Sequence, residues 1–241
     1  MHWLQIKLPY LFLPLGFLFL PSLARKTILY IAALFIIIMS LSAILVLSNY
    51  LIHFKSINES FLRGNGIPMP FSHIRYTLML VFSFFLCLYL LKNTDETKHK
   101  KQLIVWLASA AIFLFFVIHV FSVRSSLIAL YAGLTFSIGR YIWLQKKWMT
   151  GIAMLLLLVI IPVTAYYTVP SFHNKVRFMV YDWQQFKAGN INTLNDAMRV
   201  VSIDVGWNVF KQQPILGTCS GDLRQACLEQ YKRLYPQTND A

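Results

Sequence analysis

The stretch HVFSVRSSLIALYAG, at residues 119–133, joins two long apolar runs that cover residues 103–121 and 126–144. Only four residues, Ser122, Val123, Arg124 and Ser125, separate the two runs. A helix needs about 20 consecutive and mostly apolar residues to span a bilayer, and each run has about that length. The sequence therefore predicts two membrane-spanning helices that meet in a tight turn, and the turn contains an arginine.

Composition extends this prediction to the whole chain. Hydrophobic residues make up 57% of the sequence and charged residues only 13%, which excludes an ordinary soluble domain. We predict about six spans, at residues 8–23, 28–50, 75–91, 103–121, 126–144 and 149–168. Residues 169–241 are polar and aromatic and contain no run long enough to span. We therefore expect an all-α polytopic membrane protein, with a transmembrane helical domain at 1–168 and an extramembrane helical segment at 169–241.

The distribution of basic residues predicts the orientation. One set of loops contains Arg25, Lys26, Lys92, Lys98, Lys100, Lys101, Arg140, Lys146 and Lys147. The opposite loops contain only Lys55, Arg63, Arg75 and Arg124. Because cytoplasmic loops are enriched in Lys and Arg, the first set should be cytoplasmic. The turn at Arg124, the 51–74 loop and the C-terminal segment should then lie outside, in the periplasm of a bacterium whose inner membrane holds the protein.

The net charge of +13 arises mostly from the membrane part. Residues 1–168 contain 14 Lys and Arg against three acidic residues, whereas the C-terminal segment contains eight against six. A nucleic-acid-binding protein would have a basic face on a soluble module, and this chain offers none. We expect membrane lipids, and no nucleic acid, among its partners.

The segments outside the predicted spans differ in character. The 51–74 loop contains Gly64, Gly66, Pro68 and Pro70 and is interpreted as a loop with turn chemistry. The C-terminal segment should form three helices, at 171–188, from after Asn195 to about 212, and from 223 to about 234. In the second of these, Asn195 suits the N-cap, Asp196 suits the first turn, and Val200, Ile203, Trp207 and Phe210 form one apolar stripe. Asp222 should cap the third helix.

Arg124 and Arg199 are the residues best suited to bind an anion. The planar guanidinium of arginine binds phosphate oxygens through two parallel hydrogen bonds. For Arg124, the alternative is that the side chain extends to lipid headgroups from the end of its span. Arg199 falls in the first turn of its predicted helix, where free N–H groups favour anions, and the alternative there is a local ion pair with Asp196.

Further candidates lie near these arginines or in the loop after the second tail helix. Gly217 and Gly221 allow a tight turn or a close approach to a ligand, and Asp222 is either a cap or part of a site. His119 lies about one turn before Arg124, and His73 with Arg75 forms a similar pair. Histidines of this kind are more often structural than catalytic.

The cysteines and histidines indicate no metal site. Cys87 lies within a predicted span, and Cys219 and Cys227 are either two free thiols or a disulfide. No Cys/His spacing resembles a zinc site, and no nucleophile triad, Walker loop or metalloprotease motif is present. We expect neither a metal nor a cofactor.

The chain resembles the O-antigen ligase and O-antigen polymerase superfamily of bacterial membrane proteins, from about residue 5 to the end. The most specific elements are the Ser-Arg-Ser sequence of Ser122, Arg124 and Ser125 at the start of a span, and a second motif in the tail. That motif is Arg–(seven residues)–Trp–(six residues)–Pro–x–x–Gly, formed here by Arg199, Trp207, Pro214 and Gly217. Cys219 is unusual at its place in the family's glycine-rich turn.

The resemblance implies an inverting, metal-independent membrane glycosyltransferase. Such an enzyme transfers a glycan from a polyprenyl-pyrophosphate carrier at the periplasmic face to lipid A-core or another glycan acceptor. It implies that Arg124 and Arg199 are catalytic and stabilise the pyrophosphate leaving group. The implied substrate-binding residues are Arg75, His119, Ser122, Ser125, Trp207, Gly217, Gly221 and Asp222.

Members of the family have a His-Asn motif after this region, thought to activate the acceptor, and further spans. The sequence ends at YPQTNDA without them, so we expect a truncated fragment that lacks the group implied to activate the acceptor. Three alternatives to a ligase stay open: a polysaccharide polymerase of the same fold, a transporter of organic anions, and a non-catalytic remnant.

Overall fold

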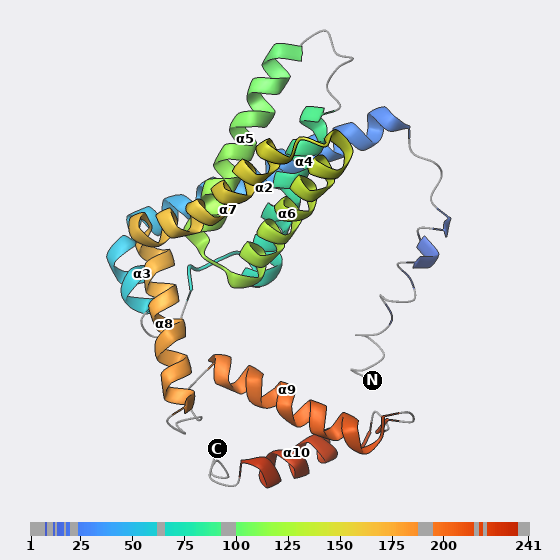
Figure 1. Cartoon of the computed structure of the whole chain (residues 1–241), viewed down its shortest axis with the longest axis vertical. Coiled ribbons are helices and arrows are strands. Elements are labelled where there is room, and N and C mark those ends of the chain that lie inside the picture. The colour runs from blue at the N-terminus through green and yellow to red at the C-terminus, as the bar shows by residue number, and fades with distance from the viewer. Residues whose placement is uncertain are drawn as a thin grey trace. The chain divides into compact units, whose positions relative to one another are not determined.

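A computed structural model of the chain describes residues 8, 12, 14–16, 18–19, 24–61, 66–92, 100–187, 195–214, 217–218 and 221–235. Within these residues, helix is the only regular secondary structure, which confirms the all-α class (Figure 1). The helices are α2 (Arg25–Ile52), α3 (Phe54–Phe61), α4 (His73–Lys92), α5 (Lys100–Phe121), α6 (Arg124–Gln145), α7 (Trp148–Thr168), α8 (Pro170–Lys187), α9 (Asn195–Gln212) and α10 (Leu223–Leu234).

Five helices of the described residues, α2, α4, α5, α6 and α7, are long and apolar enough to cross a membrane. Each corresponds to a predicted span, and no end differs from the prediction by more than three residues. Most of the predicted first span, 8–23, lies outside the described residues. The structure therefore confirms a helical protein with several candidate membrane spans, whereas the number of six remains a prediction.

The chain divides into two compact units. The first consists of Met1–Asn49 and Met69–Ile118, and the second of Tyr50–Pro68 and His119–Ala241. Helices α6 and α7 thus belong to the same unit as the C-terminal segment. The predicted boundary at residue 168 separates a transmembrane part from an extramembrane part. The compact units have other boundaries and do not test it, so it stays a prediction.

Polar and aromatic contacts join the helices of the first unit. The hydroxyls of Ser42 in α2 and Tyr76 in α4 lie 3.0 Å apart in a hydrogen bond. The rings of Phe84 in α4 and Phe115 in α5 lie 5.8 Å apart. A hydroxyl pair of this kind is satisfied within the apolar surroundings of its helices. Fully buried side chains of these helices include Ile36, Ala43, Leu80, Cys87, Leu107 and Leu114.

In the second unit, α6 and α7 pack against each other as a helical hairpin. Lys146 ends α6 in a left-handed conformation with φ of 50°, and its N–H donates to the carbonyl of Ile142 at 2.8 Å. Gly151 of α7 is buried against the side chain of Ile142, which occupies the space that a Cβ atom at residue 151 would need. A glycine therefore allows the close approach of these two helices just after their turn.

The predicted 51–74 loop contains a short helix, α3, that its Gly and Pro residues did not indicate. Phe54, Ile57 and Phe61 recur at helical spacing within α3, and Ile57 is buried. Helix α3 packs against α8, which in turn packs against α7 and α9. The glycines and prolines follow α3 in the sequence and do not interrupt it.

The tail forms the three predicted helices, α8, α9 and α10. Helix α9 packs against α8 and α10, and its buried apolar side chains are Val201, Val205 and Val209. The predicted apolar stripe of α9 is a different one: Ile203 and Trp207 are 73% and 55% exposed. Helix α9 therefore has two apolar stripes, and only the valine stripe is packed.

Candidate functional site

The turn between α5 and α6 has a strained but well-bonded backbone. Ser122 adopts a left-handed conformation with φ of 53°, which is rare for residues other than glycine. Its side chain is buried, and its Oγ donates to the carbonyl of His119 at 2.7 Å. The hydroxyl thus satisfies a carbonyl at the C-terminal end of α5, where helices lack intrahelical donors. Ser122, predicted to bind substrate, uses its hydroxyl within the turn.

Two more serines hold this turn. The Oγ of Ser126, in the first turn of α6, donates to the carbonyl of Val123 at 2.7 Å. The Oγ of Ser171, near the start of α8, donates to the carbonyl of Val120 at 2.6 Å. Both serines are fully buried. Because Ser171 is 51 residues away in the sequence, its hydrogen bond attaches the beginning of the tail to the turn.

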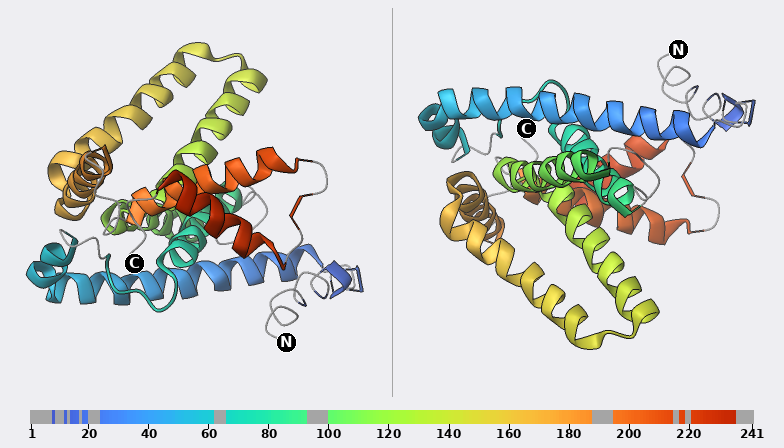
Figure 2. Two further views of the ribbon diagram at one scale, coloured as in Figure 1. Left: turned by 90° about the horizontal axis from the view of Figure 1, so that it is seen from below. Right: turned by 90° about the horizontal axis from the view of Figure 1, so that it is seen from above.

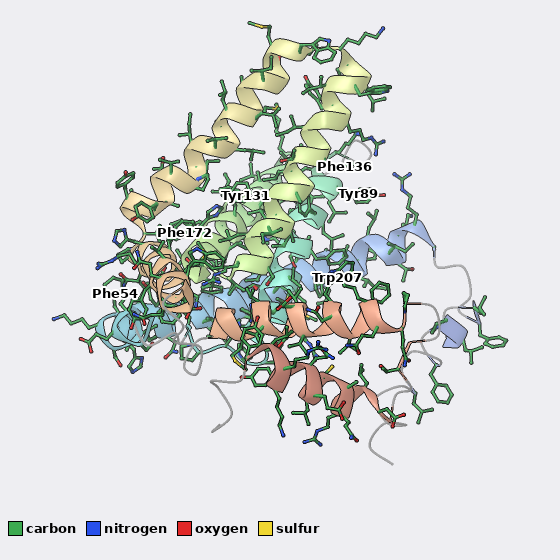
Figure 3. All side chains as sticks on the ribbon, turned by 60° about the horizontal axis from the view of Figure 1, so that its bottom comes forward. Phe54, Tyr89, Tyr131, Phe136, Phe172 and Trp207 are labelled. Carbon is green, nitrogen blue, oxygen red and sulfur yellow. The ribbon has the colours of Figure 1, made fainter. Side chains whose placement is uncertain are left out.

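A histidine and a tyrosine connect the last turn of α5 to α6. His119 is buried, and its Nε2 lies 2.7 Å from the hydroxyl of Tyr131 in a hydrogen bond. The two rings are nearly perpendicular, with an interplanar angle of 89°. Tyr131, labelled on α6 in Figure 3, is seven residues after Arg124, and a spacing of seven places both on one face of a helix. The contact therefore fixes the rotation of the helix that begins with Arg124.

Arg124 is the first residue of α6 and is partly buried. The N-cap residue, Val123, makes no side-chain capping hydrogen bond, and the first helical bond runs from the N–H of Leu127 to the carbonyl of Val123. The N–H groups before Leu127 have no intrahelical acceptor, and the helix dipole adds positive potential there. An arginine and a helix N-terminus thus coincide, and both favour an anion. Ser125, the next residue, is partly exposed.

Arg199 is exposed on α9, as the fifth residue of that helix. It lies just past the first turn in which we expected it, because the helix already begins at Asn195. The side chains of Asn195 and Asp196 lie outside the described residues, so the predicted cap and ion pair stay predictions. Arg124 and Arg199 both interact with other groups of the chain.

Trp207 lies on the face of α9 turned away from α10 (Figure 3). Its ring stacks on Phe210, with centroids 5.5 Å apart and an interplanar angle of 23°. The Nζ of Lys211 lies 5.7 Å from the centroid of the Trp207 ring. Two exposed aromatic rings and a cation therefore form one surface of α9, the helix that contains Arg199.

Asp204, one helical turn before Trp207, attaches α9 to the end of α10. The hydroxyl of Tyr235 donates to one carboxylate oxygen of Asp204 at 3.0 Å, and Nδ2 of Asn208 lies 3.1 Å from the other. Burial and the neighbouring Asp204 carboxylate raise the pKa of Tyr235. The neutral phenol is therefore the form that supports the packing of α9 against α10.

The loop between α9 and α10 has the tight turn that its glycines predict. Gly217 has a φ of 65°, and its N–H donates to the carbonyl of Gln213 at 3.0 Å. Gly221 is exposed. Asp222 stands at the N-cap of α10, as predicted, but its side chain makes no capping hydrogen bond. The structure thus confirms that Asp222 precedes α10 at the N-cap, but it shows no hydrogen bond from the Asp222 side chain to the helix.

The predicted site residues are thus distributed over several elements. His119, Ser122, Arg124 and Ser125 lie together at the α5–α6 turn, where the sequence expects them. Helix α6 packs against α7, whereas α9, with Arg199, packs against α8 and α10. The convergence of the two arginines on one ligand therefore stays a prediction. Arg75 is exposed near the start of α4, in the first unit.

Two residues that contact the turn or the helix after it, Tyr131 and Ser171, were not among the predicted site residues. Tyr131 is one aromatic residue among many in an apolar run, and Ser171 stands outside the predicted spans. The spacing of seven from Arg124 to Tyr131 was a usable indication that both lie on one face of α6. Nothing in the sequence indicated that Ser171 contacts Val120, because the contact depends on the fold.

Among the described residues, no group of three or more His, Cys, Asp or Glu side chains is placed to hold a metal ion. Cys87 and Cys227 are free thiols, Cys87 being buried. Cys219 lies outside the described residues. Comparisons of the chain with protein-family models, curated proteins and solved structures gave no match.

Proposed function

We propose that this chain is a membrane glycosyltransferase of the O-antigen ligase type. It transfers a glycan from a polyprenyl-pyrophosphate carrier to lipid A-core or a related acceptor at the periplasmic face of the bacterial inner membrane. The observation that supports this most strongly is the position of Arg124. It is the first residue of α6, at an N-terminus without a side-chain cap, in a turn fixed by serine hydroxyls. This combination suits a pyrophosphate group.

The contacts of α8 support a common membrane face for the turn and the tail. Between α3 and the α5–α6 turn, the chain passes through the candidate spans α4 and α5. Between that turn and α8 it passes through α6 and α7. An even number of crossings returns a chain to the same side of a membrane. The packing of α3 on α8 and the hydrogen bond from Ser171 to the turn agree with this count.

The same count leaves Lys92, Lys101, Lys146 and Lys147 at the opposite ends of the spans. These lysines favour the cytoplasmic side, so the turn would face the periplasm. A lipid-linked pyrophosphate keeps its charged group at the membrane surface, which is the level at which a turn between two spans lies. The position of Arg124 therefore suits an anion that remains attached to the bilayer.

In the proposed reaction, the oxygen of an acceptor hydroxyl forms a bond to the anomeric carbon of the donor sugar. The bond between that carbon and the pyrophosphate oxygen breaks, the hydroxyl proton passes to water, and polyprenyl pyrophosphate leaves with added negative charge. Arg124, with Arg199 as its proposed partner, would neutralise this charge as it develops. A positive group that acts mainly on the leaving oxygen lowers the barrier more than it tightens donor binding.

The test is glycan transfer by variants of the full chain in proteoliposomes that contain the lipid-linked donor and a lipid A-core acceptor. Arg124→Ala and Arg199→Ala should each reduce transfer by at least about 100-fold, the usual effect of removing such a group. Arg140→Ala is the matched control, because Arg140 is exposed near the other end of α6. Its transfer rate should stay close to that of the unmodified chain.

Two readouts make the result specific. Membrane insertion of each variant is measured in parallel, so that loss of transfer is separated from loss of folding. The glycan product is resolved on gels, since a single ligated product indicates a ligase and a ladder of chain lengths indicates a polymerase. Normal transfer by either the Arg124 or the Arg199 variant would refute the proposed role of both arginines.

A further inference from the structure

Helix α8 buries two polar side chains and exposes several apolar ones. Ser171 and Asp182, with 0% and 1% of their surface exposed, are eleven residues apart, which places them on one helix face. Three apolar side chains outside this buried strip, Met179, Val180 and Trp183, are 42%, 48% and 51% exposed, and Val180 is opposite Ser171 on the helix. A helix on a water-soluble protein normally has the reverse arrangement. Because α3, α7 and α9 already pack on α8, its apolar side faces away from these neighbours.

The start of α8 lies at the end of a candidate membrane span. Helix α7 ends at Thr168, and only Val169 separates it from Pro170, the first residue of α8. The hydrogen bond from Ser171 to Val120 also holds this end of α8 at the turn between the candidate spans α5 and α6. The first turn of α8 is therefore held at the level where these spans end.

The direction of α8 differs strongly from that of α7. In the left view of Figure 2, α7 is seen along its length, whereas α8, where the chain continues, is seen nearly along its axis. A helix that continued the direction of a span would leave the membrane surface within a few residues. A helix that turns sharply at the end of a span can lie along the surface instead.

The residues beside the apolar side of α8 suit the boundary between lipid and water. On a helical wheel, His173 and Arg177 are next to Val180, and Arg177 is exposed. Trp183 and Tyr181 are the aromatic types that are enriched at membrane interfaces. Basic side chains at the edge of an apolar stripe reach lipid phosphates while their stems stay on apolar surface.

We propose that α8 is an interfacial helix, with Met179, Val180 and Trp183 inserted between lipid headgroups and acyl chains. Its polar side faces the protein and its apolar side faces lipid. Lipid is the occupant that fits better than a second copy of the chain, because the apolar stripe directly continues from a candidate span. The flanking basic residues favour anionic headgroups. This inference does not depend on the proposed enzymatic activity.

The experiment is photo-crosslinking of the full chain in vesicles of phosphatidylethanolamine and phosphatidylglycerol. A benzophenone amino acid is introduced in separate variants, Val180→p-benzoylphenylalanine and Trp183→p-benzoylphenylalanine. The control variant has the same change at Gln225, which is exposed on the polar helix α10. After illumination, intact-protein mass spectrometry should find the mass of one added phospholipid at positions 180 and 183, and no lipid adduct at position 225.

Two outcomes would overturn the proposal. A crosslinked dimer at positions 180 and 183, without lipid adducts, would mean that a second copy covers this side of α8. Absence of any adduct at both positions would mean that the stripe faces water. Because the two variants replace different residues, failure of one to insert leaves the other as a test, and insertion is measured for both.

Discussion

The hydrogen bond from Ser171 to the carbonyl of Val120 should decide how firmly the tail is held to the turn. The change Ser171→Ala removes the hydroxyl and leaves the rest of the packing in place. The bond is short, at 2.6 Å, and both partners are buried. We expect α8 to detach more readily from the α5–α6 turn in this variant, while the spans stay folded.

The magnitude follows from what happens to the carbonyl of Val120. A buried acceptor left with no donor costs about 1–3 kcal/mol. Here the Oγ of Ser122 also lies within 3.3 Å of the same oxygen, so the carbonyl keeps a weaker donor. The loss should therefore be near the lower end, about 1 kcal/mol, which corresponds to an increase of about fivefold in the population of the detached form.

Limited trypsin cleavage in detergent measures that population. Lys175 and Arg177 lie within α8 and are cleaved only when the helix opens, so cleavage at low protease concentration follows the equilibrium of opening. The initial rate at these sites should rise about fivefold in Ser171→Ala, in proportion to the detached population. Mass spectrometry of the fragments identifies the bond that is cut.

Ser202→Ala is the matched control. The Oγ of Ser202 also donates at 2.6 Å, to the carbonyl of Met198, but within one helix and in an exposed position. Water replaces such a hydroxyl, so this variant should be cleaved in α8 at the unmodified rate. Equal cleavage rates for the Ser171 and Ser202 variants would refute the idea that Ser171 attaches the tail to the turn.

Three further predictions concern other contacts. Gly151→Leu should destabilise the α6–α7 hairpin by about 1–3 kcal/mol, because the side chain of Ile142 fills the space, and adding Ile142→Ala should restore thermal stability in part. His119→Leu and Tyr131→Phe remove the same hydrogen bond, so a double-mutant cycle of unfolding should show that the second change adds little to the first. The contribution of Tyr235 to the free energy of unfolding should be complete below its ordinary pKa of 10.0. It should be lost as the pH rises through the raised pKa of the folded state. Thermal unfolding of Tyr235→Phe should show no such alkaline loss.

Sequence periodicity predicted most helices. The spans are marked by long apolar runs, and the tail helices are bounded by clear turn residues. It did not indicate α3, since eight residues give only two helical turns, and the Gly and Pro residues that follow dominated the pattern. In α9, the spacing of the larger side chains predicts an apolar stripe from Val200 to Phe210, and this stripe is exposed. The smaller residues Val201, Val205 and Val209 are the ones that are buried.

The candidate site was predictable only where neighbours in sequence are neighbours in space. Arg124, Ser122 and His119 lie within six residues, and the boundary between two apolar runs located the turn that contains them. Ser171 reaches the same turn from 51 residues away, and no spacing rule relates the two. The position of Arg199 relative to Arg124 is a long-range relation of the same kind, so the motifs name both residues without fixing the distance between them.

Residue 122 is a serine and not a glycine, and this affects how the turn holds Arg124, the residue of the proposed chemistry. Glycine would adopt the φ of 53° without strain, whereas serine there costs of order 1 kcal/mol. The hydroxyl offsets that cost with its hydrogen bond to the His119 carbonyl, and it fills a position that is 2% exposed. A glycine turn would leave this carbonyl without the hydroxyl and would add freedom to the backbone two residues before Arg124. The serine turn instead gives the first residue of α6 a single orientation, which an arginine needs if it is to act on one charged oxygen at the membrane surface.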